Sequence, residues 1–339
     1  MKIYIVTNSN NFFGQLIYPW DSIDIQKVIS ILAQEYEIIH LTFESIVNSD
    51  INIQDSIVLY SSSQLIEYKE YIEDVLFYLD QKGNTLIPSL NVFKSHENKG
   101  YQELHKRILG IRSLKAKYFG HHKELDNLLE FPVVLKELDG FGSGKVSIAH
   151  SRNEIVKNTT KRNRLSYLSF YMKKMRTLLA KPVKKYVLNK EIINFNYGDY
   201  FDVFKRFIVQ EYKEDLKFDY KVLVINKKYY VLKRYVAQND FRASGSGNFS
   251  FEEVDHSLLE YSRALFDKFN EPIMAFDICY SEKQYFLIEF QGTHFGPYTQ
   301  IYSKGYYQIV GNQWKYKNGN FDFSEEIAQS YLNYLKING

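Results

Sequence analysis

Short apolar runs alternate with helical apolar stripes along residues 1–95. The runs are typical of buried strands, whereas apolar side chains at every third or fourth position predict helices, the first of them capped by Asp21. Strands are predicted at 3–6, 38–43, 57–60 and 85–88, and helical stripes at Ile25, Val28, Ile29, Leu32 and at Leu65, Tyr68, Ile72, Val75, Leu76, Leu79. This alternation indicates a small parallel sheet covered by helices.

Residues 96–205 combine helical and strand patterns. The pattern predicts mostly helix over 96–130, then strands at 131–136 and 146–149 around a glycine-rich loop at 140–144. Residues 157–190 contain many Lys and Arg but no Asp or Glu. We interpret this basic block as an amphipathic helix whose basic face is solvated. The alternatives are that the block binds an anionic substrate or an acidic membrane surface.

The last third of the chain is rich in strands. An apolar strand ends in Gln210-Glu211-Tyr212, and a second predicted hairpin turns at residues 226–228. Helices are expected at 251–269 and 324–336, and a polar aromatic segment lies between Gly292 and Tyr316. His294 in this segment is expected to be an exposed loop histidine.

The hairpin Ile273–Gly292 carries carboxylates inside its apolar runs. Glu289 and Gln291 share a face because strand side chains alternate, and Asp277 falls opposite Glu289 if the connection holds three or five residues. Two facing carboxylates repel each other, and a bound Mg²⁺ (or Mn²⁺) would remove that repulsion. The alternative is an edge hairpin whose charges point into solvent.

The loop at 140–144 has the composition of a phosphate-binding loop. Its three glycines allow close approach to a phosphate, and Lys136 and Lys145 flank it. It is not a Walker A loop, because Asp139 stands at the first glycine position and Val146 follows Lys145. The alternative is an ordinary flexible turn.

Composition excludes several classes of protein. The 339 residues carry a net charge of only +3, which does not demand a nucleic-acid partner, and none is predicted. The single cysteine, Cys279, lies in an apolar run and is expected to be a buried inert thiol. The sequence shows neither a signal peptide nor a membrane span, so we expect a cytoplasmic protein.

The order of these features resembles the ATP-grasp superfamily over about residues 96–300. The resemblance implies an α+β fold in which two subdomains clasp ATP. It further implies a Rossmann-like α/β domain at 1–95, a subdomain with the lid and basic insert at 96–205, and a C-terminal subdomain with the metal site at 206–339.

The resemblance also implies roles for individual residues. Lys99 and Lys136 are similar to phosphate-binding lysines, and Glu214 to a ribose ligand. Lys221 and Arg234 resemble the cations at the transferred phosphate, and Arg242 resembles the arginine that stabilises the tetrahedral intermediate. Gln291 departs from the usual Asn of the metal set Asp277, Glu289 and Gln291. The remaining implied positions are the lid Phe141, Gly142, Ser143, Gly144, the adenine hinge Gln210, Glu211, Tyr212, and the substrate loop Ser244, Gly245, Ser246.

The activity implied by the resemblance is ATP-dependent ligation of a carboxylate to an amine through an acyl phosphate, with ATP and Mg²⁺ bound. We expect small-molecule substrates, with a sugar acid or amino acid for surface-polysaccharide modification as one interpretation. A peptide-modifying ligase, a small-molecule kinase and a nucleotide-binding module without turnover are the alternatives. The sequence does not decide whether the protein forms a homodimer through its N-terminal domain.

Overall fold

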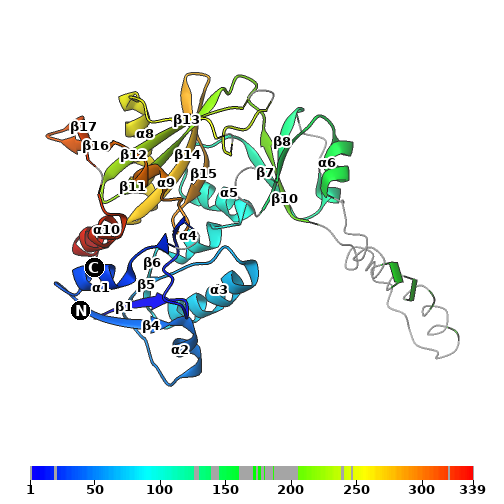
Figure 1. Cartoon of the computed structure of the whole chain (residues 1–339). Coiled ribbons are helices and arrows are strands. Elements are labelled where there is room, and N and C mark those ends of the chain that lie inside the picture. The colour runs from blue at the N-terminus through cyan, green and yellow to red at the C-terminus, as the bar shows by residue number, and fades with distance from the viewer. Residues whose placement is uncertain are drawn as a thin grey trace. The chain divides into compact units, whose positions relative to one another are not determined.

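The computed structural model describes residues 2–18, 21–125, 130–138, 145–159, 205–237, 240–245, 247–319 and 321–338, with single positions between 171 and 186. The chain forms two compact units (Figure 1). The first comprises residues 1–115 and 213–339, and the second residues 116–138 and 145–212.

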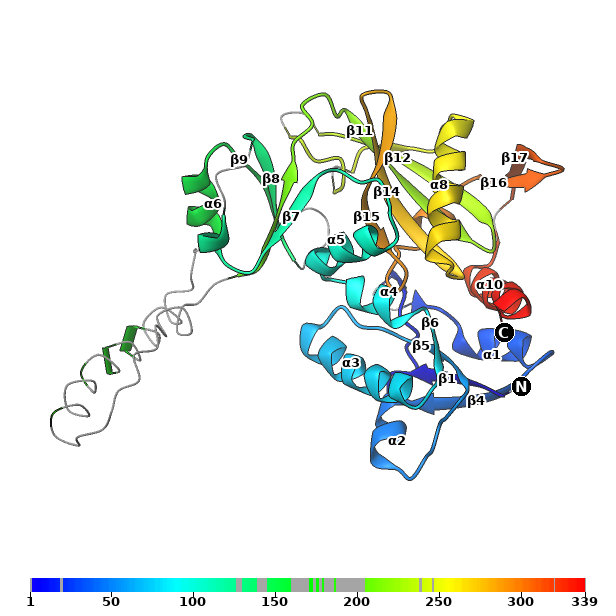
Figure 2. The same cartoon turned by 180° about the vertical axis from the view of Figure 1, so that it is seen from behind.

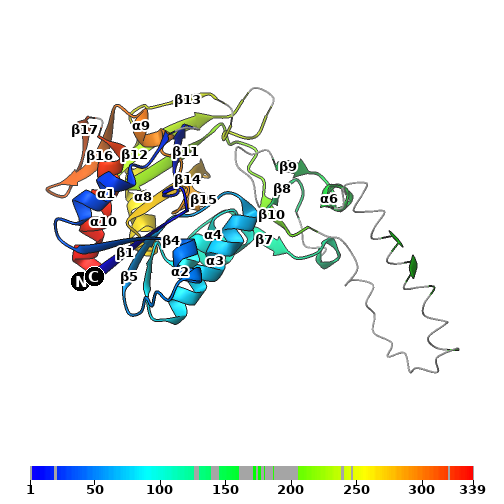
Figure 3. The same ribbon diagram turned by 60° about the horizontal axis from the view of Figure 1, so that its bottom comes forward.

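A four-stranded parallel sheet opens the first unit, with the strand order β4-β1-β5-β6. Helices α1, α3 and α5 come from segments predicted to be helical, whereas no helix was predicted at α2 or α4. Asp24, not Asp21, caps α1. The bounds are β1 (Lys2–Thr7), β2 (Leu16–Tyr18), β3 (Asp21–Ser22), α1 (Ile25–Leu32), β4 (Glu37–Thr42), α2 (Phe43–Asn48), β5 (Ile57–Tyr60), α3 (Ile66–Gln81), β6 (Thr85–Ile87), α4 (Leu90–Ser95) and α5 (Lys99–Ile108). Figure 3 shows this sheet with α2 and α3 beside it.

Each face of the parallel sheet has its own core. Val6 and Val58 point to the α2–α3 side, where Phe43 and Leu76 are fully buried. Ile3, Ile5 and Leu59 point to the other side and join α1, α10 and one face of the larger sheet in a single apolar cluster. The large sheet is therefore anchored to the parallel sheet within one unit.

The large sheet of the first unit has the order β15-β14-β11-β12-β16-β17, and β13 pairs with β12. Its hairpins turn at Asn226-Lys227 and Glu282-Lys283, four residues that all have positive φ. Its second face packs on α8 through Val222, Phe276 and their neighbours (Figure 2). The bounds are β11 (Phe218–Ile225), β12 (Lys228–Tyr235), β13 (Phe249–Ser250), α8 (His256–Phe269), β14 (Ile273–Ser281), β15 (Gln284–Gln291), α9 (Tyr298–Ile301), β16 (Gly305–Val310), β17 (Gln313–Asn318) and α10 (Phe323–Asn338).

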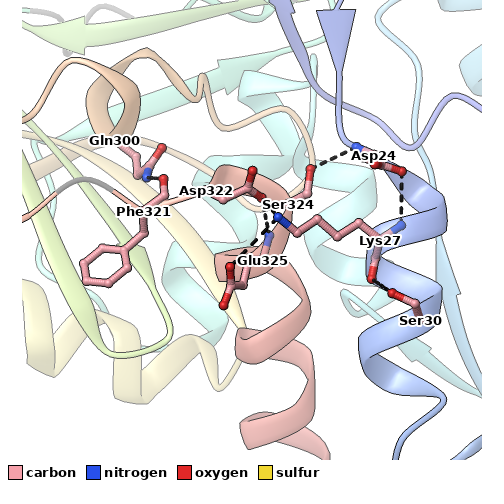
Figure 4. A network of polar contacts seen from close by, with 8 residues as sticks. All are labelled: Asp24, Lys27, Ser30, Gln300, Phe321, Asp322, Ser324 and Glu325. Atoms are coloured by element: carbon pink, nitrogen blue, oxygen red, sulfur yellow. Dashed lines mark hydrogen bonds and ion pairs between the residues drawn. The ribbon is translucent and has the colours of Figure 1, made fainter.

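Polar contacts join the start of α10 to α1 (Figure 4). The Lys27 ammonium lies 3.0 Å from the Asp322 carboxylate and 3.9 Å from that of Glu325. The Asp24 amide donates to Ser324 Oγ at 2.9 Å, so the residue that caps α1 also contacts α10. These contacts hold the start of the C-terminal helix against α1.

The second unit is a four-stranded antiparallel sheet with the order β7-β10-β8-β9. Phe119, Leu135, Ile155 and Phe207 are buried in its core. The basic block lies mostly outside the described residues. The bounds are β7 (Ala116–Phe119), the 3₁₀ helix η1 (His122–Glu124), β8 (Val133–Glu137), β9 (Val146–Ala149), α6 (Arg152–Thr159) and β10 (Phe207–Glu211).

The mixed α and β fold is confirmed, and most predicted elements are present within a few residues. Cys279 is fully buried, as expected. The prediction was wrong at β7, which lies in a segment predicted to be helical, and no strand was predicted at β16 and β17. No helix among the described residues is long and apolar enough to cross a membrane.

Glu271 makes the stability of the first unit depend on pH. Burial raises the pKa of this carboxyl to about 7, although Oε1 accepts a hydrogen bond from the Ser89 amide at 2.9 Å. Between pH 4.5 and about 7 the folded protein holds a proton that the unfolded chain has released, so stability falls as pH rises through this window. We expect Glu271→Gln to remove this slope and to gain up to about 3 kcal/mol at pH 8. Thermal unfolding from pH 5 to 8 measures it, and equal slopes in both proteins would contradict the assignment.

Candidate active site

Three charged side chains line up across adjacent strands of the large sheet. Lys221 of β11 is directly opposite Asp277 of β14, which is directly opposite Glu289 of β15. Cross-strand partners share a face of a sheet, so all three side chains project to the same side. The predicted facing of Asp277 and Glu289 is therefore confirmed, and the solvated-edge alternative fails for Asp277, which is 8% exposed.

A β-bulge produces this facing, not the expected three- or five-residue connection. The turn has two residues, because Ser281 pairs with Gln284. An unbroken register from that pair would place Ile288 opposite Asp277. The register shifts between Asp277 and Ile278, and the extra residue in β15 brings Glu289 into line.

Helix α5 holds the bulged strand from its outer edge. The Lys106 ammonium donates to the Ile288 carbonyl at 3.2 Å and to Glu103 at 2.7 Å. Gln102 accepts a hydrogen bond from the Phe290 amide at 3.4 Å. Lys106 is only 1% exposed, so a buried ion pair satisfies the backbone of an edge strand at the bulge. Side chains nearly two hundred positions earlier thus contact the backbone on both sides of Glu289.

Arg234 joins a second carboxylate to the site. Its guanidinium contacts both Asp219 oxygens, at 2.6 and 2.9 Å, and Asp277 Oδ2 at 3.1 Å. Burial opposes the charge on Arg234, but Asp277 and Asp219 outweigh it and raise the pKa of the guanidinium. Burial raises the pKa of Asp219, and Arg234 opposes that shift.

One carboxylate oxygen of Asp277 accepts no hydrogen bond. Oδ1 is buried and has no hydrogen-bond partner, and it lies on the carboxylate that faces Glu289. A hard cation bound by carboxylate oxygens would satisfy it, so the donor set fits Mg²⁺ or Mn²⁺. Asp219 is committed to Arg234, and no group of three His, Cys, Asp or Glu suited to a metal occurs among the described residues.

Lys221 and Gln291 contact each other beside the acidic pair. Lys221 Nζ donates to Gln291 Oε1 at 3.4 Å. Burial lowers the pKa of this ammonium, and Asp277 opposes the shift. Gln291, the predicted third metal ligand, thus presents its amide oxygen to Lys221. Metal binding by Gln291 stays a prediction.

Comparison with known proteins gives structural matches only: no protein-family model and no curated protein sequence matches the chain. D-alanine–D-alanine ligase from Bacillus anthracis superposes with a TM-score of 0.51 at 14% identity, over 99% of this chain and 98% of that one. A D-cycloserine synthetase gives 0.52 at 10% identity over 99% and 100%. The Chryseobacterium gregarium RiPP-associated ATP-grasp ligase, solved with ADP and a leader and core peptide, gives 0.52 at 13% over 100% and 97%. The chain has the ATP-grasp fold.

The second unit of this ATP-grasp fold carries the residues predicted to bind adenine and phosphate. Lys136 of β8 is 7% exposed and pairs with Ile208 of β10. Gln210 is 2% exposed, and its Nε2 is buried without a partner, which leaves a donor for a ligand. Glu211 and Tyr212 are half-buried at the strand end. The predicted lid, Phe141 to Gly144, lies outside the described residues.

The remaining predicted positions belong to the first unit. Lys99 is the first residue of α5 and half-buried, whereas Glu214 is exposed. Arg242 forms a bidentate ion pair with Asp240, at 2.7 to 3.0 Å, instead of projecting without a partner. Ser244 is half-buried, Gly245 is exposed with φ 82°, and Ser246 lies outside the described residues.

Several residues around the candidate site carry no local sequence signal. Asp219, Lys106 and Gln102 contact the site only through long-range packing. His294 is half-buried, not exposed as expected, and its Nε2 is fully buried. The signal that was available for His294 is its place three positions after Gln291, at the end of the strand that carries Glu289.

Proposed function

We propose that this protein is an ATP-dependent carboxylate–amine ligase that forms an amide through an acyl phosphate, with release of ADP and phosphate. The observation that carries the proposal is the alignment of Lys221, Asp277 and Glu289 on one sheet face. Asp277, the middle residue of the three, has a buried Oδ1 without a hydrogen-bond partner. Ligase activity of proteins with the same fold supports it.

Mg²⁺, when bound, would offset the charge of the ATP phosphates and polarise the transferred phosphoryl group. Asp277 and Glu289 would hold the ion. Arg234 orients Asp277 through its 3.1 Å contact, and Lys221 lies on the same face beside it. These half-buried cations suit a reaction that develops negative charge on phosphoryl oxygens.

We propose that Lys136 and Lys99 contact phosphates, that Gln210, Glu211 and Tyr212 hold the adenine, and that Glu214 reaches the ribose. The lid would comprise Phe141, Gly142, Ser143 and Gly144, and the substrate loop Ser244, Gly245 and Ser246. Arg242 would stabilise the tetrahedral intermediate once it exchanges Asp240 for substrate, because its ion pair is partly exposed.

A two-part screen tests the ligase. The protein is incubated with Mg²⁺, ATP and panels of sugar acids, amino acids and peptides, and ADP release is measured. Peptides are included because one protein of this fold was solved with a leader and core peptide. Hydroxylamine is then added in place of the amine, because it converts an acyl phosphate into a stable hydroxamate.

The products separate the proposal from its alternatives. A ligase gives ADP and, when its carboxylate substrate is present, the hydroxamate of that substrate. A small-molecule kinase gives ADP and a stable phosphorylated product but no hydroxamate. ATP binding without ADP release across all panels would reject both enzymes and leave a nucleotide-binding module, for which salt-sensitive binding to anionic polymers is the expected property.

A further inference from the structure

Arg234 divides its guanidinium unequally between two carboxylates of the first unit. It donates two hydrogen bonds to Asp219, from Nε to Oδ1 at 2.6 Å and from Nη2 to Oδ2 at 2.9 Å. It makes one contact with Asp277, from Nη2 to Oδ2 at 3.1 Å, and Asp277 Oδ1 has no hydrogen-bond partner. The double contact of an arginine with a carboxylate is the stronger arrangement, so Asp219 holds the guanidinium more firmly than Asp277 does.

The order of the strands explains why Asp219 takes the double contact. Arg234 lies on β12 and Asp277 on β14, and β11 runs between these two strands. Asp219 of β11 is directly opposite Arg234, whereas Lys221, two residues further along β11, is opposite Asp277. Residues two apart in a strand share a face, so the Arg234 side chain must pass Asp219 before it reaches Asp277.

The three side chains are largely shielded from water. The exposed fractions of the Asp219, Arg234 and Asp277 side chains are 11%, 12% and 12%. A charge that is removed from water needs a partner, because leaving it unpaired is costly. Without Asp219, the guanidinium would therefore turn further toward Asp277, the other carboxylate that it already contacts.

That rearrangement would cover the oxygen that a metal ion needs. A double contact with Asp277 uses both carboxylate oxygens, whereas the present single contact leaves Oδ1. This carboxylate faces Glu289, and hard oxygen donors of this kind suit Mg²⁺ or Mn²⁺. A guanidinium on both oxygens of Asp277 would compete with the ion for its ligand.

We propose that Asp219 is a positioning residue that restrains Arg234 to one oxygen of Asp277 and so keeps the other oxygen for the metal ion. Asp219 acts through Arg234 and does not itself bind the ion. The inference rests on the metal site of the proposed ligase, but it does not depend on the identity of the substrates.

Mn²⁺ binding tests the inference without turnover. The full chain is titrated with Mn²⁺ alone at pH 7.5, and free Mn²⁺ is measured by electron paramagnetic resonance. We expect Asp219→Asn to lower the affinity about 10- to 100-fold, because Arg234 then takes both oxygens of Asp277.

A second substitution separates geometry from charge. Asp219→Asn/Arg234→Lys has the same net charge as Asp219→Asn, but an ammonium cannot contact two oxygens as a planar fork does. We expect this double variant to bind Mn²⁺ at least about 5-fold more tightly than Asp219→Asn. If Asp219 acted only through its negative charge, the two variants would bind Mn²⁺ equally weakly.

An apolar pair keeps the test decisive if Asp219→Asn does not fold. Replacing both members of a buried ion pair by apolar side chains is often neutral or stabilising, so Asp219→Leu/Arg234→Met should fold. No guanidinium then covers Asp277 Oδ1, and the affinity for Mn²⁺ should lie within about 3-fold of that of the natural protein. A loss of more than about 10-fold in this variant would show that Asp219 acts independently of Arg234.

Glu326→Gln is the matched control for lost stability. Glu326 pairs with Lys228, the first residue of β12, and its side chain is only 4% exposed. The substitution breaks a buried ion pair on the strand that carries Arg234, so the melting temperature should fall. The affinity for Mn²⁺ should stay within about twofold of that of the natural protein, because this ion pair lies at the other end of the strand.

The outcomes separate this inference from the proposed function. Unchanged affinity in Asp219→Asn, or an equal loss in Asp219→Asn and Glu326→Gln, would overturn the positioning role alone. A natural protein that binds no Mn²⁺ would overturn that role together with the proposed metal site. The ADP-release screen can fail while the expected order of affinities holds, because Mn²⁺ binding needs no substrate.

Discussion

Glu289→Gln is expected to abolish most ATP turnover while ATP binding survives. The substitution keeps the size of the side chain but removes the charge that faces Asp277 across the bulge. A metal ion held by a single carboxylate would be bound weakly, and the loss of its charge stabilisation is worth several kcal/mol, so ADP release should fall by at least about 100-fold. Raising the Mg²⁺ concentration should restore part of the rate, which separates weak metal binding from misfolding.

Glu282→Gln is the matched control for Glu289→Gln. Glu282 lies in the turn of the same hairpin, where it is exposed and pairs with Lys213 at 2.6 Å. Its replacement should change neither turnover nor the Mg²⁺ dependence by more than about twofold, because exposed ion pairs contribute little. Normal turnover in Glu289→Gln, or an equal loss in both variants, would remove the acidic pair from the active site.

Local sequence patterns predicted the elements that bury a regular apolar stripe. The hairpin β14–β15 and helices α1 and α8 follow such patterns closely. β7 lies in a segment predicted to be helical, and no strand was predicted at β16 or at β17, where four of six residues are Gln, Lys or Asn. Pairing with neighbouring strands stabilises all three. Tertiary pairing outweighs weak local preference in such strands.

In the candidate site, too, local sequence predicted some features, and others depend on contacts between distant segments. The hairpin sequence placed Asp277 and Glu289 in one region, yet it could not show the bulge that brings them face to face. Lys106 and Gln102, far away in the sequence, contact the strand at that bulge. The partnership of Arg234 with Asp219 and the burial of His294 likewise depend on packing between distant segments.

Lys106→Met is expected to damage both the stability of the protein and its metal site. The substitution leaves Glu103 buried without its cation, which costs about 3–5 kcal/mol, and it frees the Ile288 carbonyl at the bulge. If the bulge relaxes to the unbroken register, Ile288 replaces Glu289 opposite Asp277. We therefore expect a lower melting temperature and an affinity for Mn²⁺ reduced about 10- to 100-fold, as when groups that orient metal ligands are removed.

The double variant Lys106→Met/Glu103→Met separates these two effects. Replacing both members of a buried ion pair by apolar side chains is often neutral or stabilising, so the melting temperature should recover. The Ile288 carbonyl still lacks its donor, and the affinity for Mn²⁺, measured by electron paramagnetic resonance in the presence of ATP, should stay low. Lys106→Arg keeps a cation beside that carbonyl and should restore part of the affinity. If the double variant binds Mn²⁺ like the natural protein, strand pairing alone holds the bulge and Lys106 contributes only stability. If the affinity stays low in a fully stable protein, α5 positions Glu289 for the metal.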